Sequence, residues 1–505
     1  MSIAIPPGHH RGRGDTAAPQ RRLPRLRVVA AVAATVALAG CATTTEGQGR
    51  SSLFNPNTVG GMAVVEGPSG VRPDAPEAEG TVDYTDKSEA DELALLAVND
   101  VVQYWEEHYT DPPFDGTFEP VENLASYDST DPSGPRLCGQ DLYDSPNAFF
   151  CPRADLIAWD RGELVPTGIN YFGEASIAAL LAHEYGHAVQ TLGEIVDRST
   201  PVIVREQQAD CFAGSYIRWV AEGSSPRFQL NTSDGLNRVL AAAITIRDPV
   251  LTLDDRAMIE EGHGTALDRV AAFQTGFIDG VDVCARIDLE QIEASRGDLP
   301  MMLTPDESGT VPTGDAPITE KLVTTIIDAL NQVFGPAQPP TITVQSPAPA
   351  CPDVEATPPA AYCPATNTIA VDLPALQALG STAGTEERVL VQGDNSAISV
   401  LTSRYTLALQ HERGAPIDTV TAALRTACLT GVAQRKMVEP IQTPQGGSIV
   451  LTAGDLDEAV AGLLNNGIAA SDVNGITVAA GFTRITAYRS GLINPDAEAC
   501  YTRFP

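Results

Sequence analysis

The chain has 505 residues, of which 65 are acidic and 32 are Lys or Arg, so its formal net charge at pH 7 is −33. Such a charge repels the phosphates of nucleic acids, which argues against nucleic-acid binding, and it predicts a soluble, highly charged surface. Hydrophobic residues form 43% of the chain, enough for folded cores, and the length predicts more than one domain.

Residues 1–41 have the composition of a secretory signal. Residues 1–27 are rich in Arg and contain one acidic residue, and a short apolar run from Val28 to Gly40 follows. As a helix this run would span about 20 Å, too short for a hydrocarbon core of about 30 Å. It ends in Leu-Ala-Gly-Cys, which resembles a bacterial lipobox, so we expect Cys41 to be lipidated and to begin the mature chain. The alternative is an ordinary signal peptide with a coincidental cysteine.

The mature protein is therefore expected on the extracytoplasmic face of a bacterial cell membrane, held there by its lipid anchor. No second stretch of the sequence is long and apolar enough to span a membrane. Residues 42–88 are rich in Thr, Gly, Ser, Pro and acidic side chains and lack an apolar period, so we interpret them as a flexible acidic tether.

A first folded domain is predicted over residues 89–288. Residues 289–316 contain Pro, Gly, Asp and Thr without clear periodicity and are interpreted as a linker, which leaves 317–505 as a second domain. In the first domain the apolar spacing predicts a strand at 156–159 and helices at about 89–109, 175–192, 202–223 and 265–276.

The helix predicted for 175–192 contains His-Glu-Tyr-Gly-His at 183–187, an HExxH motif. Residues four apart share one face of a helix, so His183 and His187 can bind one metal ion together. Glu184 then projects beside the metal, where a general base for an attacking water would lie. The alternative is a surface helix with two chance histidines.

A third ligand is expected on the following helix, because catalytic zinc sites usually have three protein ligands and one open position. Glu206 and Asp210 are four residues apart and share a helical face. Glu206 can meet the metal while Asp210 accepts a hydrogen bond from a ligand histidine and fixes its tautomer. Taken alone, this segment would be interpreted as a solvated acidic face.

The segments at 183–190 and 206–214, His-Glu-Tyr-Gly-His-Ala-Val-Gln and Glu-Gln-Gln-Ala-Asp-Cys-Phe-Ala-Gly, resemble a family of bacterial neutral zinc metallopeptidases. Gly262-His263-Gly264, Arg269 and the Cys-Pro element at 151–160 resemble further elements of that family, and the resemblance covers about residues 90–288. It implies a zincin-like fold of the Glu-ligand type. The implied zinc ligands are His183, His187 and Glu206, with Glu184 as catalytic base.

Two further expectations concern the handling of a substrate. His263 is a candidate donor to a tetrahedral oxyanion, and the alternative is a structural histidine in a Gly-rich turn. The strand at 156–159 is expected to offer a free edge on which an extended peptide adds as a strand.

Four segments of the first domain recur in the second in the same order, which indicates an internal duplication. The alternative is two unrelated domains of similar composition. The matched pairs are 151–160 with 363–372, 181–186 with 409–414, 211–214 with 428–431, and 269–273 with 484–488.

Eight cysteines remain once Cys41 is set aside, and an even number in an exported protein indicates disulfide bonds. Their order is the same in both halves, so the duplication predicts one short and one long closed loop in each. The expected bonds are Cys138–Cys151, Cys211–Cys284, Cys351–Cys363 and Cys428–Cys500.

The second copy lacks the ligand set. In this alignment His411 and Glu412 keep the first two positions of the motif, but Ala415 stands at the second histidine. The positions aligned with the two acidic residues of the next helix hold Ala423 and Ala427. We expect a degenerate domain that packs against the first as an internal pseudo-dimer.

Together these patterns predict an α+β protein, a mainly helical zincin-like domain with a small sheet, duplicated in tandem. The leading hypothesis is a membrane-anchored zinc peptidase that acts on a peptide or protein substrate. The alternatives are a non-catalytic envelope lipoprotein that binds or scaffolds a partner, and a zinc amidase that acts on cell-wall material. The sequence indicates neither a cleavage specificity nor an oligomeric state.

Overall fold

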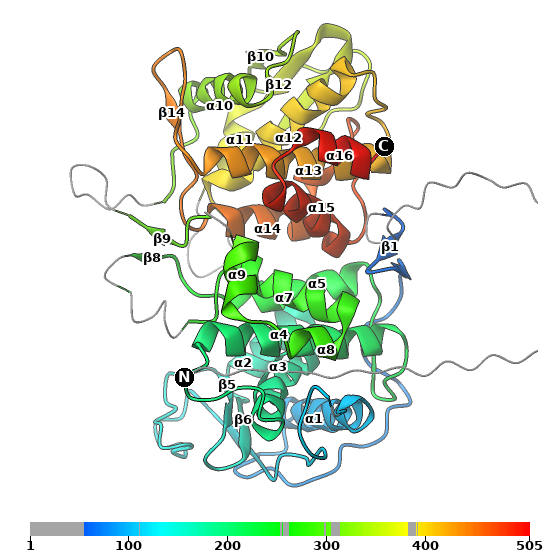
Figure 1. Cartoon of the computed structure of the whole chain (residues 1–505), viewed down its shortest axis with the longest axis vertical. Helices are drawn as coiled ribbons and strands as arrows, with labels where there is room; N and C mark the ends of the chain where they lie inside the picture. Colours follow the sequence, from blue (N-terminus) through cyan, green and yellow to red (C-terminus); the bar gives the residue numbers. More distant parts are fainter. Residues whose placement is uncertain are drawn as a thin grey trace, which may run out of the picture. The chain divides into compact units, whose positions relative to one another are not determined.

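The computed structural model describes residues 55–110, 112–252, 255, 262–296, 299–304, 314–381, 390 and 392–505. The predicted signal segment and the lipidation site Cys41 lie outside these residues. The described residues belong to one compact unit of mixed α and β structure, in which helices predominate (Figure 1). Among the described residues, no helix combines the length and the apolar character that crossing a membrane requires.

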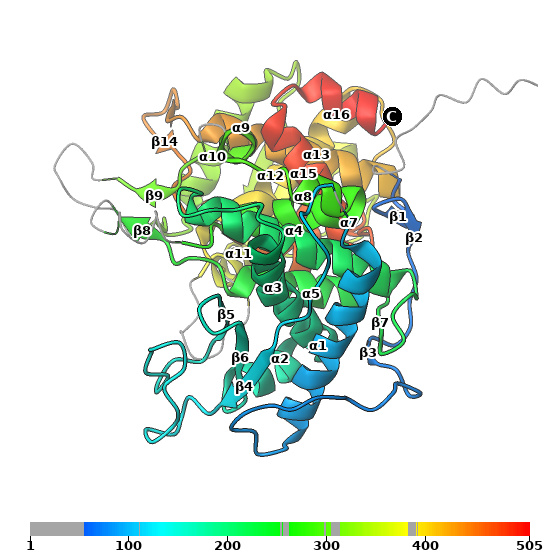
Figure 2. The ribbon, with the colours of Figure 1, turned by 60° about the horizontal axis from the view of Figure 1, so that its bottom comes forward.

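The first half is built on a three-stranded sheet and a set of packed helices. In the sheet, β6 lies in the middle, parallel to β4 and antiparallel to β5. Figure 2 shows these strands beside α2 and α3. The elements are α1 (Glu89–His108), β4 (Asn123–Tyr127), β5 (Ala148–Cys151), β6 (Leu156–Asp160), α2 (Leu164–Phe172), α3 (Glu174–Leu192), α4 (Val202–Ala221), β7 (Phe228–Gln229), α5 (Asp234–Thr245), β8 (Leu251–Thr252), α7 (Ala266–Asp279), α8 (Val281–Cys284), α9 (Leu289–Arg296) and β9 (Met302–Leu303).

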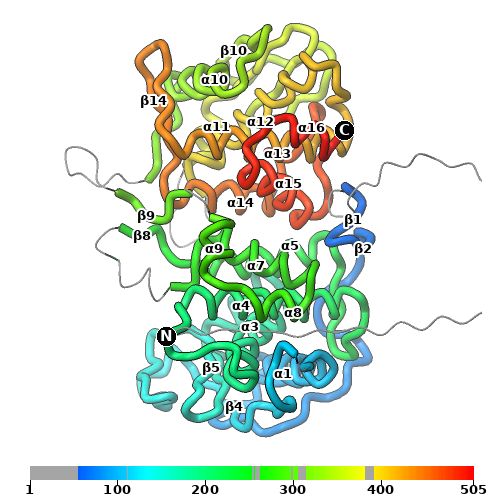
Figure 3. Tube along the Cα trace, viewed as in Figure 1, coloured from blue at the N-terminus to red at the C-terminus, as the bar shows by residue number. Residues whose placement is uncertain are grey.

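The second half has a sheet of the same arrangement, with β12 in the middle, parallel to β10 and antiparallel to β11. Helices again follow the sheet, as the trace in Figure 3 shows. The elements are α10 (Glu320–Phe334), β10 (Thr341–Val344), β11 (Ala360–Cys363), β12 (Thr368–Val371), α11 (Leu373–Leu379), α12 (Asp394–Glu412), α13 (Val420–Met437), β13 (Ile441–Gln442), β14 (Ser448–Ile449), α14 (Asp455–Asn465), α15 (Gly481–Ile493) and α16 (Ala497–Arg503).

The helices α4 and α7 approach so closely that only glycine fits at the crossing. A Cβ at Gly214 would lie 2.1 Å from the carbonyl oxygen of Phe273, and a Cβ at Gly276 would lie 1.7 Å from that of Cys211. In the second half, Gly431 and Gly491 make the same kind of contact between α13 and α15. Since real side chains cannot tolerate such distances, each glycine pair fixes how closely its two helices pack.

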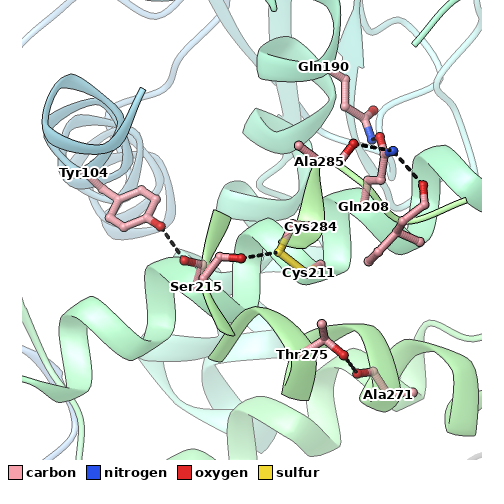
Figure 4. The surroundings of a disulfide bond; sticks show 11 residues. Tyr104, Gln190, Gln208, Cys211, Ser215, Ala271, Thr275, Cys284 and Ala285 are labelled. Carbon is pink, nitrogen blue, oxygen red and sulfur yellow. Dashed lines mark hydrogen bonds between the residues drawn. A yellow bond between two sulfur atoms is a disulfide. The ribbon is translucent and has the colours of Figure 1, made fainter. Parts of the chain in front are cut away.

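All four expected disulfide bonds are present, and among the described residues no disulfide joins one half to the other. The pairs are separated by 13 and 73 residues in the first half and by 12 and 72 in the second. Figure 4 shows the bond between Cys211 of α4 and Cys284 of α8, beside the hydrogen bond from Tyr104 to Ser215 that joins α1 to α4. Four disulfides indicate an oxidising, extracytoplasmic setting.

Residues 55–88 do not behave as the tether that their composition suggests. Val59 is fully buried, Val71 N donates to Glu174 Oε2 at 2.7 Å, and Thr483 donates to the carbonyl oxygen of Thr58. Although this segment has no apolar period, its backbone forms short strands that pair with other strands. The strands are β1 (Thr58–Val59), paired with β2 (Met62–Ala63), and β3 (Gly70–Val71), paired with β7.

The predicted linker 289–316 is also partly folded. It contains α9, whose Ile292 is buried and whose Arg296 forms an ion pair with Asp268 at 2.8 Å, and it contains β9, which pairs with β8. Helix α5 lies between the helices predicted at 202–223 and 265–276, in a segment for which the sequence predicted no helix. The predicted strand 156–159 is β6, but it is the central strand and has no free edge; the edge strands are β4 and β5.

Several carboxylates gather where the N-termini of α12 and α14 meet. Glu458 accepts a hydrogen bond from Asn395 N at 2.8 Å, and Asp394 accepts one from Ala316 N at 2.8 Å. Backbone N–H groups at helix N-termini favour carboxylates, but mutual repulsion and burial oppose their ionisation. Burial, together with Asp394 and Asp315, raises the pKa of Glu458 to about 8.

This raised pKa predicts a pH-dependent stability. The folded state favours protonated Glu458, so its contribution is complete below about pH 4.5 and is lost as the pH rises through about 8, at ~1.4 kcal/mol per unit of pKa shift. Glu458→Gln should flatten the fall in melting temperature between pH 5 and 9, with the exposed Glu439→Gln as control. Parallel melting curves for Glu458→Gln and the wild type would contradict this assignment.

Candidate metal centre

The candidate centre lies where α3 crosses α4. The crossing is close because Gly186 faces α4, and a Cβ at this position would lie 3.0 Å from the Cα of Ala209. The α3 segment is rich in Ala and Leu, which favour a helix, and nearly all of it is buried. Its two histidines, one turn apart, therefore face α4 across a short gap.

The structure brings together the three predicted ligands, His183, His187 and Glu206. One ligand atom from each lies within 4.8 Å of the others, a spacing at which the group can hold a metal ion. The Nε2 atoms of His183 and His187 lie 3.3 and 3.5 Å from the two carboxylate oxygens of Glu206. The oxygen next to His183 is buried and lacks hydrogen-bond geometry with any group that the structure describes, as expected of an atom that can accept a metal.

The outward-facing nitrogens of both imidazoles are held by hydrogen bonds. His183 Nδ1 lies 2.8 Å from Asp210 Oδ1, and His187 Nδ1 lies 3.0 Å from Gln190 Oε1. With Nδ1–H donating in both rings, each Nε2 presents its lone pair to the centre. Asp210 was predicted for this role from the sequence. Arg269 holds it in turn by donating to the same oxygen at 2.7 Å.

The protonation states of the histidines and carboxylates at this centre depend on one another. Burial opposes protonation of His183, but the Asp210 carboxylate outweighs burial and raises the pKa of His183 to about 10. Burial likewise opposes ionisation of Glu206, but the His187 and His183 imidazoles hold its pKa well below its usual range. Without a metal, proton uptake by the imidazoles would balance the carboxylates, and a divalent cation would supply that positive charge instead and leave each Nε2 lone pair free to bind it.

Glu184 lies beside the three ligands and is buried. Its Oε2 accepts a hydrogen bond from the backbone N–H of Phe150 in β5 at 3.1 Å. Burial raises the pKa of Glu184, and the neighbouring imidazoles of His183 and His187 oppose that shift. A carboxylate with a raised pKa is suited to accept a proton and then to release it.

His263 also reaches this site, from the segment before α7. Its side chain is 51% exposed, with Nε2 3.7 Å from Glu206 Oε2 and Nδ1 3.6 Å from Asp248 Oδ1. Asp248 accepts hydrogen bonds from the backbone N–H of His263 at 2.9 Å and of Gly264 at 2.7 Å. Burial opposes ionisation of Asp248, but the His263 imidazole and these backbone bonds outweigh it and lower the pKa of Asp248.

A cleft of about 300 Å³ opens over the centre. Strand β5 forms one wall, α3 and α4 carry the ligands, and His263 borders the opening. The donation from Phe150 to Glu184 shows that this N–H points away from β6 and towards the cleft. The edge of the sheet that faces the candidate centre is therefore β5, and the sequence assigned that edge to the wrong strand.

Among the described residues of the second half, no two histidines and a carboxylate form a group like that of the first half. The sequence alignment of the acidic positions of α4 agrees with the paired glycine contacts, but the alignment misplaced the counterparts of the HExxH residues. His411 and Glu412 lie at the C-terminal end of α12, whereas His183 and Glu184 lie in the middle of α3. Both helices have 19 residues, and both end in the same backbone pattern: residues 193 and 195 donate to 189 and 190, and residues 413 and 415 donate to 409 and 410.

This pattern matches Gln190 with Gln410, a shift of eight residues from the alignment made on sequence alone. The sequence alignment differs because it matched the His-Glu pair at 411–412, which resembles the motif by chance. The correspondence of Gln410 with Gln190 becomes visible only in the structure. The positions that correspond to the HExxH residues are then Ser403, Arg404 and Leu407, all buried. The conclusion that the ligands are missing from this half is unchanged.

Three residues of the site were missed from the sequence. Gln190 follows His187 by three residues, a helical spacing that could have indicated the contact. Asp248 and Phe150 give no such signal, because each reaches the site from a segment without periodicity. The comparisons with protein-family models, with curated proteins and with solved structures gave no match.

The geometry predicts that metal binding depends on Glu206. Glu206→Gln should weaken metal binding by more than about 100-fold, because it removes the one charged ligand while the fold is retained. Metal content after gel filtration, and competition with a chelator, would measure the change. Glu222→Gln, which alters only a surface pair with Arg218 near the end of the same helix, should bind metal as the wild type does. Equal metal content in all three proteins would contradict the assignment.

Proposed function

We propose that this protein is an extracytoplasmic zinc peptidase that hydrolyses amide bonds at the centre formed by α3 and α4. The observation that carries the proposal is the ligand group of His183, His187 and Glu206, with both imidazoles oriented by outer hydrogen bonds. Two imidazoles and one carboxylate are a donor set typical of catalytic zinc, which leaves a fourth position open.

When bound, zinc would acidify a water molecule and polarise the scissile carbonyl. Glu184 takes the proton of the attacking water and passes it to the leaving amine, since a pKa raised by burial lets one carboxylate perform both steps. His263, at the border of the cleft, donates to the oxygen that becomes negative in the tetrahedral state. Its partner Asp248 holds it in place through the backbone.

An extended peptide would bind along β5. In a strand, alternate residues face the same edge, so the backbone groups of Ala148 and Phe150 face the cleft while Asn147 accepts from Asp160 of β6. A peptide that pairs with this edge places one of its amide bonds next to the ligands and Glu184. This arrangement replaces the edge that was expected at 156–159.

An apolar pocket of about 130 Å³ lies behind His183, between α2, α3 and α5. Its walls include Phe172, Leu180 and Val239, and the Asp210–Arg269 pair lies at one side. A volume of this size suits one apolar side chain of a substrate. The apolar lining favours a peptide over the alternative of an amide in cell-wall material, which the ligand set would serve equally well.

The apolar pocket predicts a preference for peptides with a large apolar residue next to the cleaved bond. Ala243 lines it from α5, so Ala243→Phe should fill the pocket and lower kcat/KM for peptides with a large apolar residue next to the cleaved bond by about 10- to 100-fold. Peptides with Ala or Gly there should be affected little. A library of peptides that differ only at this residue would measure the ratio, and an equal loss for all peptides would argue against the pocket.

We also propose that the two halves arose by duplication and that Cys41 carries a lipid anchor. The duplication is supported by the equal strand arrangement of the two sheets, the equal disulfide spacings and the paired glycine contacts. The anchor is supported by the Leu-Ala-Gly-Cys sequence and by the disulfides, which suit an exported protein. A non-catalytic scaffold would need neither the ligand group nor Glu184.

The proposal is tested by Glu184→Gln. This variant should keep one zinc per chain and lose peptide hydrolysis by at least about 1000-fold, because the amide cannot accept the proton. Glu194→Gln, an exposed change just beyond the end of α3, is the matched control and should retain activity. Full turnover by Glu184→Gln would remove it as the base, and a wild-type protein without zinc and without hydrolysis would support the scaffold.

A further inference from the structure

We propose that Asp457, in the second half of the chain, is a positioning residue for the candidate active site of the first half. It joins the two segments that carry His263 and Asp248 and thereby holds His263 at the cleft. This inference rests on the proposed function and assigns the second half a part in it.

Asp457 lies on α14, which packs on α5 and α7 of the first half (Figures 1 and 3). It is only 5% exposed, and its two carboxylate oxygens reach different segments. Oδ1 accepts a hydrogen bond from the backbone N–H of Ala266, the first residue of α7, at 3.0 Å. Oδ2 lies 3.2 Å from Nε of Arg247. One side chain of the second half thus bridges two segments of the first.

Both bridged residues are neighbours of the groups at the cleft. Arg247 directly precedes Asp248, and Ala266 follows His263 by three residues. Asp248 binds the N–H groups of His263 and Gly264 through its carboxylate, and its own N–H donates to the carbonyl oxygen of Gly264 at 3.1 Å. The two segments are therefore linked at one end by Asp457 and at the other by Asp248.

The position of the His263 side chain depends on these two linked segments, 247–248 and 263–266, which form a frame for it. Its two nearest ion-pair atoms among the described residues are 3.6 and 3.7 Å away, beyond ordinary hydrogen-bond length, so its backbone sets its position. The positive φ of Gly264, +97°, allows the tight turn that follows. A shift of the frame by about 1 Å would move the imidazole relative to the ligands, and shifts of that size can cost about 100-fold in rate.

Asp457 is not part of the capping box of α7. The N-terminus of α7 already has a complete capping box, in which Thr265 and Asp268 bind each other's backbone N–H groups. The backbone N–H of Ala266 has no acceptor within this capping box, and it donates to Asp457. The contact therefore adds a connection between the halves to a helix that is capped without it.

A double-mutant cycle tests the proposal in the full-length protein. Asp457→Asn places an amide opposite Arg247 and should lower kcat about tenfold, with KM and zinc content little changed. If Asp457 acts through His263, adding Asp457→Asn to His263→Ala should lower kcat by less than about twofold further. Losses that multiply in the double variant, or an unchanged kcat in Asp457→Asn, would overturn the inference.

Two controls separate positioning from general weakening of the contact between the halves. Gln274→Leu removes hydrogen bonds from α7 to Phe482 and Thr486 in α15, away from His263, and should leave kcat unchanged. Arg247→Gln opens the same bridge from the other side and should reproduce the effect of Asp457→Asn, which covers the case that Asp457→Asn does not fold. A loss in Gln274→Leu equal to that in Asp457→Asn would also overturn the inference.

Hydrogen exchange distinguishes failure of this inference from failure of the proposed function. If the wild type hydrolyses no amide, the proposed peptidase function fails, but the positioning of His263 still has a readout. The amides of residues 263–266 should exchange faster in Asp457→Asn than in the wild type, and Gln274→Leu should leave them unchanged. Unchanged exchange of these amides in Asp457→Asn would show that Asp457 does not hold the segment.

Discussion

The candidate centre depends on one buried carboxylate oxygen, Oδ1 of Asp210. It accepts hydrogen bonds from His183 on α3 and from Arg269 on α7, while Asp210 itself belongs to α4. Three helices are thus joined by two charge-assisted bonds between buried side chains, where such bonds are strong and costly to break. The orientation of the first histidine and the packing of α4 between its neighbours are consequences of the same contact.

The surrounding framework makes this contact possible. Glycines at the crossing of α4 and α7 bring the backbones together, and the bond between Cys211 and Cys284 ties α4 to the helix that follows α7. The second half repeats the framework with buried Ser403, Arg404 and Leu407 where the first half carries its histidines and Glu184. The framework is therefore compatible with either set of residues, and the ligands are not required to build it.

Local spacing was enough to predict much of the site. The HExxH motif and Glu206 lie on regular helices, so their faces follow from the helical period, and the repeated order of cysteines predicted all four disulfides. Contacts between distant segments were not predictable in this way. The burial of 55–88, the edge position of β5 and the approach of Asp248 to His263 depend on residues far apart in sequence, and a chance His-Glu pair at 411–412 misled the alignment of the second half.

Gly186 has a consequence for the candidate metal centre. Its missing side chain allows α3 to rest against Ala209, and this contact, rather than any ligand, sets the distance between the two imidazoles and the carboxylate. Two imidazole nitrogens and one carboxylate are donors that suit zinc, whereas calcium prefers six to eight oxygens. The spacing of these donors is then a property of helix packing, set by a residue that is not itself a ligand.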